Sequence, residues 1–219
     1  MDNKENKVLI ITGGWIEDTF LSDRVKCEQY NMIIAADHGL IAADRLNVPL
    51  DFIVGDFDSV PETILEKYRA RSIPIHIFPP EKDKTDTEIA IELAIMHHAT
   101  SIDIVGATGS RLDHVLGNIH LLMLPMQLDV DTCIIDPNNK IYLKNKSFTF
   151  QKEKQYGNFV SLLPFRDKVS GLTLKGFKYP LNSITYITGS SLGISNEIKD
   201  EKATVEISDG ILLVFETKD

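Results

Sequence analysis

The chain has 219 residues, of which 43% are hydrophobic, and it carries a formal charge of -9 with a sequence pI near 5.1. Such a composition is typical of a globular protein with a sizeable core, either one large domain or a larger domain followed by a smaller one. Nucleic acid and anionic membranes attract clustered Lys and Arg, so this charge argues against both as partners.

The N-terminal residues 1–7 lack the apolar core of a signal peptide, and no apolar run reaches the roughly 20 residues of a membrane span. We therefore expect a cytoplasmic protein that does not cross a membrane. Cys27 and Cys133 are too few for a disulfide framework and too isolated for a zinc site. We expect both to be buried packing thiols.

Apolar runs alternate with helix-length segments over the first 137 residues. Most of the runs are continuous rather than alternating, as is typical of parallel strands covered on both faces. The alternation predicts a doubly wound, mostly parallel sheet of about six strands with right-handed crossovers. We expect strands near residues 8–11, 32–36, 52–54, 73–78, 102–105 and 132–135, and helices near 17–28, 40–46, 61–71, 87–98 and 112–124.

After the turn signal at residues 136–139 the pattern changes to short β-rich runs without a long helical stretch. This predicts an α/β domain over residues 1–137 and a smaller antiparallel β-sandwich or barrel over 138–219. The last two runs flank Ser208-Asp209-Gly210, where glycine can take a positive φ, so we expect a closing β-hairpin. The runs are 141–143, 148–150, 159–163, 172–174, 184–187, 204–207 and 211–215.

The stretch Gly55-Asp56-Phe57-Asp58-Ser59 directly follows a predicted strand. Ligands of open α/β sheets bind at this C-terminal edge of the strands. Side chains two apart on extended backbone point the same way, so Asp56 and Asp58 can present oxygen ligands to one Mg²⁺. The alternative interpretation is structural, with Asp56 forming a turn and Asp58 capping the next helix.

Other polar loops follow strands and are therefore expected along the same edge: Thr12-Gly13-Gly14, Asp37-His38-Gly39, residues 82–86 and residues 106–114. Aspartates gathered there repel one another unless a divalent cation binds. In the third loop Lys84 suits a triphosphate, although Thr85 and Glu88 also form a capping box. In the fourth, Arg111 either grips phosphate as a planar fork or pairs with Asp113.

Two further features concern the bases and rings of possible substrates. Loop 188–197 is polar and contains glycine, which suits recognition of an uncharged heteroaromatic group. Trp15 can stack on a base or cover the sheet edge, and we expect the second. Because the GxGxxG and GxxxxGK[ST] patterns are absent, NAD and ordinary P-loop sites are disfavoured.

Together the motifs resemble the thiamine pyrophosphokinase family, in order and over nearly the whole chain. They are Asp37-His38-Gly39, Gly55-Asp56-Phe57-Asp58-Ser59, Asp83-Lys84-Thr85-Asp86, residues 109–114 and Gly193-Ile194-Ser195-Asn196-Glu197. The resemblance implies an enzyme that transfers the diphosphate of ATP to the hydroxyl of thiamine, with Mg²⁺, giving thiamine diphosphate and AMP. It also implies an ATP-binding α/β domain, a thiamine-binding β-sandwich, and a homodimer with thiamine bound between subunits.

By the same resemblance the site residues fall into four groups. The catalytic acids are Asp56, Asp58, Asp86 and Asp113, and the Mg²⁺ ligands are Asp56, Asp58, Asp83 and Asp86. The nucleotide contacts are Asp37, Gly39, Lys84, Thr85, Thr108, Gly109, Arg111 and His114, and the thiamine contacts are Ser195 and Asn196. The chain departs from many relatives at His38, where they have Gly or Arg.

Two other functions compete with this one. The run Asp56-Phe57-Asp58-Ser59-Val60 also resembles the first motif of haloacid-dehalogenase-type phosphatases, but that motif normally follows the first strand and needs a later acidic pair. A non-catalytic nucleotide or thiamine sensor is the other, and it would have little use for an acidic rim without a metal. Turnover of ATP to AMP separates all three.

Overall fold

The computed structural model describes residues 5–58, 60–71, 73–77 and 83–219. The chain divides into two compact units, residues 1–137 and residues 138–219. We call them the α/β unit and the β unit. Ser59 of the aspartate motif, Phe78 of the fourth predicted strand and Lys82 lie outside the described residues.

Within the described residues, the α/β unit contains one sheet with strands in the order β4-β3-β2-β1-β5-β6. Every neighbouring pair is parallel, which confirms the predicted parallel sheet. The order reverses between β1 and β5, so the topological switch point lies there. The strands are β1 (Lys7–Ile11), β2 (Met32–Ala36), β3 (Phe52–Gly55), β4 (Ile75–Ile77), β5 (Ser101–Val105) and β6 (Asp131–Ile135).

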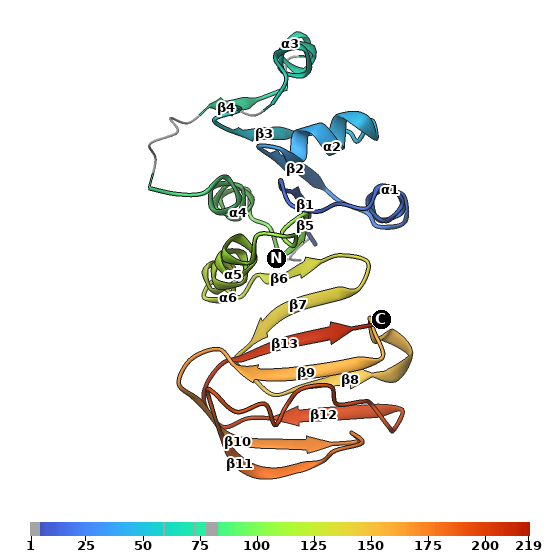
Figure 1. The fold of residues 1–219 in the computed structure, drawn as a ribbon, viewed down its shortest axis with the longest axis vertical. Helices are drawn as coiled ribbons and strands as arrows, with labels where there is room; N and C mark the ends of the chain where they lie inside the picture. Colours follow the sequence, from blue (N-terminus) through green and yellow to red (C-terminus); the bar gives the residue numbers. More distant parts are fainter. Residues whose placement is uncertain (1–4, 59, 72, 78–82) are drawn as a thin grey trace. The chain divides into compact units, whose positions relative to one another are not determined.

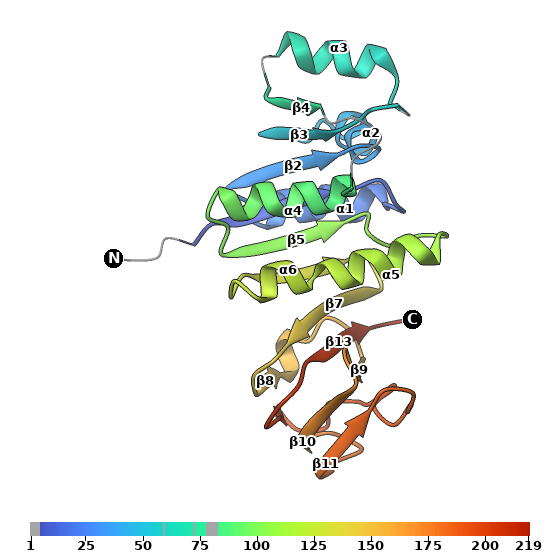
Figure 2. The ribbon, with the colours of Figure 1, turned by 90° about the vertical axis from the view of Figure 1, so that its left-hand side faces the viewer.

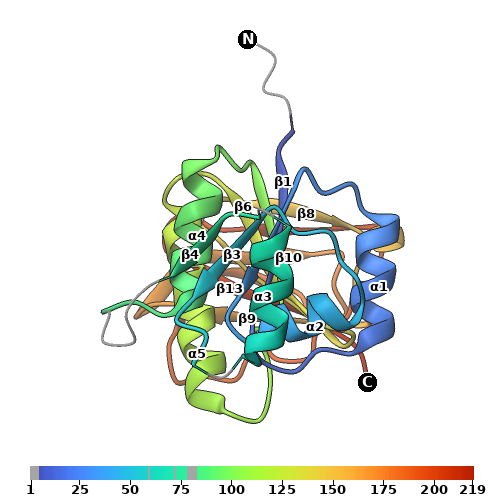
Figure 3. The same cartoon turned by 90° about the horizontal axis from the view of Figure 1, so that it is seen from above.

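Helices cover this sheet on both faces, as the continuous apolar strands require. Figures 1 and 3 show α1 and α2 on one face and α4 and α5 on the other, and in Figure 2 helices α4, α5 and α6 lie in front of the strands. No helix in the described part of the chain is long and apolar enough to span a membrane. The helices are α1 (Asp18–Cys27), α2 (Gly39–Arg45), α3 (Glu62–Ala70), α4 (Asp86–Met96), α5 (Leu112–Leu121) and α6 (Met123–Met126).

Two local predictions for this unit are wrong. The helix expected over residues 112–124 is divided at Leu122 into α5 and α6, and Pro125, which has no N–H to donate to the preceding turn, accounts for the break. Cys133 is buried as expected, but Cys27 is exposed. Leu21 is the fully buried residue of α1, whereas Lys26 and Cys27 at the C-terminal end of the helix are exposed.

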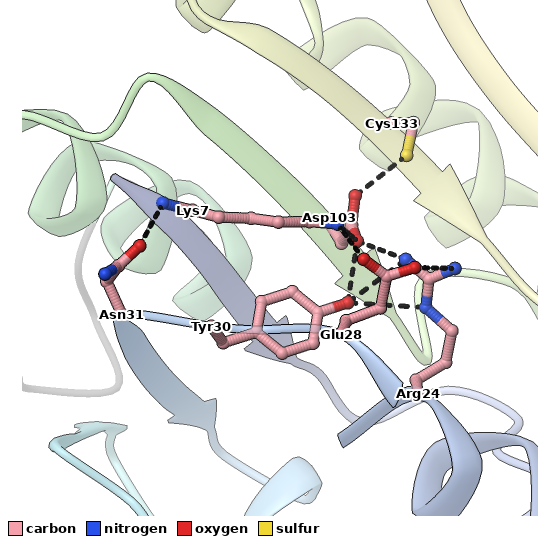
Figure 4. A network of polar contacts seen from close by, with 7 residues as sticks. All are labelled: Lys7, Arg24, Glu28, Tyr30, Asn31, Asp103 and Cys133. Atoms are coloured by element: carbon pink, nitrogen blue, oxygen red, sulfur yellow. Dashed lines mark hydrogen bonds and ion pairs between the residues drawn. The ribbon is translucent and has the colours of Figure 1, made fainter. Parts of the chain in front are cut away.

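A polar network holds α1 and the following loop to the sheet (Figure 4). Asp103 on β5 accepts hydrogen bonds from Arg24, from the Tyr30 hydroxyl at 2.7 Å and from the Cys133 thiol at 3.3 Å. Burial alone would raise the pKa of Asp103, but the Tyr30 hydrogen bond and the charges of Arg24 and Lys7 outweigh it and lower that pKa. The network therefore contains a buried carboxylate that is ionised and paired.

The β unit is an antiparallel sandwich, as predicted. One layer has the strand order β7-β13-β9 and the other β11-β10-β12-β8. The apolar faces of the two layers share a core that includes Phe150, Leu162, Phe177 and Val214. The strands are β7 (Asn139–Lys144), β8 (Phe148–Gln151), β9 (Phe159–Pro164), β10 (Lys168–Lys175), β11 (Leu181–Ile187), β12 (Lys202–Glu206) and β13 (Leu212–Thr217), and a 3₁₀ turn spans Lys152–Lys154.

The closing hairpin predicted around Gly210 is wrong. β12 pairs with β10 and β8, whereas β13 pairs with β7 and β9 in the other layer. The intervening turn continues along β10, because Ser208 donates its N–H to the Ser170 carbonyl and Asp209 accepts from the Ser170 N–H, both at 2.9 Å. Residues 207–211 thus carry the chain from one layer of the sandwich to the other, as corners in such folds do.

Candidate functional site

The loops that follow β1, β2, β3 and β5 form one continuous rim at the C-terminal edge of the parallel sheet. Asp37 after β2 donates its N–H to the Val54 carbonyl at 2.9 Å, which joins the loop after β2 to the end of β3. Gly14 after β1 donates to the Gly106 carbonyl at 2.7 Å, which joins the first loop to the loop after β5. The loops predicted at residues 12–14, 37–39, 55–58 and 106–114 therefore do share an edge.

Glycine is required where these loops approach one another most closely. A Cβ on Gly14 would overlap the carbonyl oxygens of Gly106 and Thr108, and a Cβ on Gly39 would overlap the Ile11 carbonyl. Backbone can come this close only where there is no side chain. Gly39, which we predicted to contact the nucleotide, has in this packing a sufficient structural reason to be glycine.

Three aspartates gather on the rim. Ligand oxygens of Asp37, Asp56 and Asp58 all lie within 4.8 Å of one another. Asp37 and Phe57 have positive φ angles of 45° and 60°, and the Phe57 side chain is buried. At this turn the phenyl ring points inward, whereas Asp37 and Asp56 are half-buried and Asp58 is exposed.

Part of the structural alternative for this motif is also present. Asp56 accepts the Asp58 N–H at 3.2 Å, so it does form a turn. Asp58 does not cap α3, because the N-cap position is Pro61 and no side-chain cap bond is made there. The Asp58 carboxylate therefore has no capping role that would explain it.

The three carboxylates fit a bound cation. Asp37 Oδ1 is buried and has no hydrogen-bond partner among the described residues, while Asp37 Oδ2 lies 3.5 Å from His38 Nδ1. A buried acceptor without a donor is costly unless a cation or water satisfies it. From the sequence we assigned Asp37 as a nucleotide contact and did not place it among the metal ligands. The signal was available, because Asp37 directly follows a strand just as Asp56 does.

The predicted metal ligands of the 82–86 loop lie outside that group. Asp86 is the first residue of α4 and Asp83 is exposed. The Thr85 hydroxyl accepts the Glu88 N–H at 3.2 Å, which confirms the predicted N-terminal cap. Two residues further on, the hydroxyl oxygens of buried Thr87 and Thr12 are 2.8 Å apart, so the first turn of α4 is fastened to the residue that follows β1.

The cations predicted to hold phosphate are paired with neighbouring acids. Lys84 Nζ lies 2.6 and 2.8 Å from the two carboxylate oxygens of Glu92, which raises the pKa of Lys84. Arg111 donates to both oxygens of Asp113, at 3.3 and 2.6 Å, and this pairing lowers the pKa of Asp113. Both pairs are exposed and so contribute little to stability, which leaves the cations available to a more highly charged anion.

The rest of the 106–114 loop shows what its predicted nucleotide contacts do in this structure. The Thr108 hydroxyl donates to buried Asp136 at 2.8 Å, and its carbonyl accepts the Trp15 N–H at 2.7 Å. Gly109 lies beside Trp15. His114 is exposed in the first turn of α5. Thr108 is thus a fixed part of the rim rather than a loose side chain.

In the β unit, Asn196 is a structural clamp. It is 5% exposed, and its Oδ1 accepts the N–H groups of Tyr179 and Glu197 at 3.0 and 2.9 Å while its Nδ2 donates to the Tyr179 carbonyl at 2.8 Å. Only one amide hydrogen remains for another partner. Next to it, Ser195 is exposed with a φ of 55°.

The clamp fixes Tyr179, which sequence reasoning missed because nothing in the surrounding residues marked it. Both backbone polar groups of Tyr179 are held by the Asn196 amide, whereas the residue itself is 58% exposed. Lys178, paired with Glu197, lies with its ammonium 5.5 Å from the centre of the Tyr179 ring. An exposed aromatic residue with a fixed backbone is therefore held by Asn196, the neighbour of Ser195 in the chain.

Comparisons with known proteins match the chain in both units. Residues 25–134 match the model of the thiamin pyrophosphokinase catalytic domain, and residues 146–212 match that of the thiamin pyrophosphokinase vitamin B1 binding domain. The thiamine pyrophosphokinase of Bacillus subtilis (strain 168) is 32% identical over 193 residues, which cover 88% of this chain and 90% of the relative.

Solved structures agree with these matches. A crystal structure of thiamine pyrophosphokinase from Bacillus subtilis has a TM-score of 0.87 at 30% identity, covering 98% of this chain and 100% of that one. The corresponding protein of Geobacillus thermodenitrificans has a TM-score of 0.83 at 31% identity, covering 97% and 98%. The chain therefore belongs to the thiamine pyrophosphokinase family.

Proposed function

We propose that the protein transfers the diphosphate of ATP to thiamine, giving thiamine diphosphate and AMP, and that the rim of the α/β unit is where this happens. The observation that carries the proposal is the group of Asp37, Asp56 and Asp58 at the carboxyl ends of β2 and β3. The family matches over both units support the reaction. A cytoplasmic location remains a prediction.

The phosphatase alternative receives no support from this geometry. Its motif normally follows the first strand, whereas Asp56 follows β3, the third strand of the chain. The aspartate that would be phosphorylated already accepts the Asp58 N–H through Oδ1 and lies in a group of three acids. Such a group is better suited to holding a cation than to attacking phosphorus.

Asp37, Asp56 and Asp58 would hold Mg²⁺, which prefers carboxylate oxygens together with substrate phosphates. When bound, the ion neutralises charge on the phosphate oxygens around the reacting phosphorus. The predicted ligands Asp83 and Asp86 remain candidates from the loop before α4. The Thr12–Thr87 contact keeps the first turn of that helix in register with the rim.

In the proposed reaction the hydroxyl oxygen of thiamine attacks the β-phosphorus of ATP. The bond from that phosphorus to the oxygen bridging it to the α-phosphorus breaks, AMP leaves with the electron pair, and the hydroxyl proton is released to solvent. Phosphoryl-type transfers need positioning and charge stabilisation more than covalent help from the protein. Lys84 and Arg111 supply that positioning when they exchange Glu92 and Asp113 for the phosphate oxygens.

For thiamine we propose a surface on the β unit built from Ser195 and Tyr179, both within the range that matches the vitamin B1 binding model. Tyr179 offers a ring for stacking and Ser195 a hydroxyl for hydrogen bonding. Asn196 can contact thiamine, as predicted, through the one amide hydrogen that remains free. Its larger contribution is to hold the backbone of Tyr179.

We also propose a homodimer in which loop 188–197 of one subunit serves the aspartate group of its partner. The resemblance to the family implies this arrangement, and the distribution of charge favours it. Residues 1–137 contain 23 of the 32 acidic residues, whereas the 23 basic residues divide almost evenly, 11 in the α/β unit and 12 in the β unit. An acidic unit and a mildly basic one attract each other across a subunit interface.

The reaction is tested by ³¹P NMR of the protein with Mg²⁺, ATP and thiamine. We expect AMP and thiamine diphosphate to appear in equal amounts, and the Asp56→Asn variant to produce neither at a comparable rate. Release of orthophosphate without thiamine diphosphate would identify a phosphatase. Absence of any turnover, with ATP still binding, would identify a sensor.

The shared site is tested by mixing two variants that are inactive alone, Asp56→Asn and Asn196→Ala, under conditions where subunits exchange. One site of each mixed dimer then receives both intact halves, so partial activity should return. The thermal midpoint of each variant checks that it is folded before mixing. No recovery, although heterodimers are shown to form, would place thiamine within one subunit.

A further inference from the structure

Trp15 is the only tryptophan of the chain and is 52% exposed. It follows β1 on the rim, at the boundary with the loop after β5, and the strand order reverses between these two strands. Open α/β sheets bind nucleotides at such a switch point. We expected Trp15 to cover the sheet edge, but about half of it remains in contact with solvent.

The backbone beneath the indole is fixed on both sides. The Trp15 N–H donates to the Thr108 carbonyl and the preceding Gly14 N–H donates to the Gly106 carbonyl, both at 2.7 Å. A Cβ on Gly109 would lie 3.3 Å from the Trp15 nitrogen, so the two loops are in van der Waals contact there. An exposed ring on a rigid backbone can bind a flat ligand with little loss of conformational entropy.

The next residue shows that the loop separates its two apolar side chains. Ile16 packs over Gly106, where a Cβ would lie 2.9 Å from Ile16 Cδ1, and Ile16 is less exposed than Trp15. Burying apolar surface therefore accounts for Ile16 but leaves Trp15 unexplained. No hydrogen bond or ring contact of the indole itself is recorded among the described residues.

Trp15 also lies at a suitable distance from the acids. Gly13 abuts His38, since a Cβ on Gly13 would lie 2.7 Å from His38 Cβ, and His38 adjoins Asp37. Asp56 directly follows β3, and from β3 to β1 is two strand spacings, roughly 10 Å. Phosphates held near the aspartates would leave the nucleoside of the same molecule within reach of the indole.

We propose that Trp15 is the platform on which the adenine of ATP stacks. This rests on the proposed function, because it assigns the base-binding end of the same site. Gly13 and Gly14 are exposed, and Gly13 packs against the His38 side chain, so the ribose and α-phosphate would lie across this glycine backbone beside His38. Stacking on an aromatic ring tolerates different bases, so we expect GTP to bind only a few-fold more weakly than ATP.

A single tryptophan makes the first test direct, because all indole fluorescence comes from position 15. Titration with α,β-methylene-ATP, which cannot be cleaved at the bond the reaction breaks, should quench that fluorescence in a saturable way. Inorganic tripolyphosphate has the charge without the base and should bind with little quenching. Equal quenching by tripolyphosphate and by the nucleotide analogue would overturn the assignment.

The second test uses Trp15→Ala and Trp15→Phe. Loss of one base-stacking contact should raise the KM for ATP roughly 5- to 100-fold in the alanine variant. The phenylalanine variant should recover most of that loss, and the KM for thiamine and kcat should change less than twofold in both. If the wild-type protein produces AMP as proposed but the KM for ATP is unchanged in Trp15→Ala, the stacking role is refuted while the proposed reaction stands.

Light scattering completes the comparison. If Trp15 covers an interface instead, Trp15→Ala should dissociate the protein and raise both KM values together, which also contradicts the proposal. A wild-type protein that produces no AMP would overturn the proposed function itself. The two failures are therefore distinguishable.

Discussion

Replacing Asp103 by Asn should destabilise the α/β unit strongly, although the side chain keeps its shape. The carboxylate accepts hydrogen bonds from Arg24 and Tyr30, and Lys7 Nζ lies 3.4 Å away. The side chains of Asp103 and Arg24 are only 10% and 17% exposed. In the variant a mostly buried guanidinium would face a neutral amide, so the desolvation of Arg24 would lose its main compensation.

Removing one partner of a buried ion pair costs about 3–5 kcal/mol, and we expect the lower end of that range here. The reason is that Glu28 remains close to both cations, 2.6 Å from Lys7 Nζ and 3.7 Å from Arg24. For a chain of this length, about 3 kcal/mol corresponds to a decrease in thermal midpoint of roughly 6–12 °C. Tyr30→Phe removes the hydrogen bond to Asp103 and the two that Arg24 donates to the hydroxyl, at 3.3 and 3.1 Å, but keeps the ion pair. It should therefore cost less, about 1–2 kcal/mol, which makes it the matched control.

Urea unfolding followed by Trp15 fluorescence is the assay, because the only tryptophan lies in the α/β unit and reports on that unit. The effect should depend on pH in one direction. Since the folded-state pKa of Asp103 is lowered, its stabilisation is complete above the ordinary carboxylate pKa of about 3.9 and is lost as pH falls through the folded value. A variant as stable as wild type at pH 7, or a difference that persists unchanged well below that folded pKa, would refute the reasoning.

Three further substitutions test the rim. Asp56→Asn and Asp58→Asn should each lower turnover by several orders of magnitude with little change in thermal midpoint, since mutually repelling surface acids do not support the fold; near-normal turnover at saturating Mg²⁺ removes the ligand role. Arg111→Lys should reduce kcat/KM almost as much as Arg111→Ala, because an ammonium cannot replace a bidentate fork, and a Lys variant within a few-fold of wild type would contradict this. Thr87→Val should raise the Mg²⁺ concentration needed for half-maximal activity several-fold, and Thr87→Ser should restore it; equal values in both variants would leave the hydroxyl contact without a role.

Continuous apolar runs predicted the inner strands of the parallel sheet, because a strand buried on both faces has no polar face to confuse the pattern. The edge strand β4, which is largely exposed, was found from its apolar residues alone. The same logic placed the polar loops on one rim. The errors lie where a fold-wide constraint overrides a local signal. The turn at Ser208-Asp209-Gly210 is compatible with a hairpin, but β12 and β13 each bury a face in a different layer, so the chain turns a corner instead.

The grouping of the site residues was harder to predict than their location. Which aspartates meet depends on the positive φ angles at Asp37 and Phe57, and no residue type at these positions announces them. Asn196 had the composition of a ligand contact, yet its amide is occupied by the backbone of Tyr179, seventeen positions earlier. Which side chains meet across such a distance in sequence is determined by tertiary packing and cannot be read from the spacing of residues along the chain.

The hydrogen bonds that join the loop after β1 to the loop after β5 also determine the order in which the rim is assembled. β1 pairs with β2 early in the chain, but its other neighbour begins only at Ser101. Contacts between distant segments form late, because closing the long intervening chain has an entropic cost. We therefore expect a nascent chain to bring Asp37 and Asp56 together before Gly14 and Trp15 have a partner, so that the end of the rim beside Trp15 is completed last.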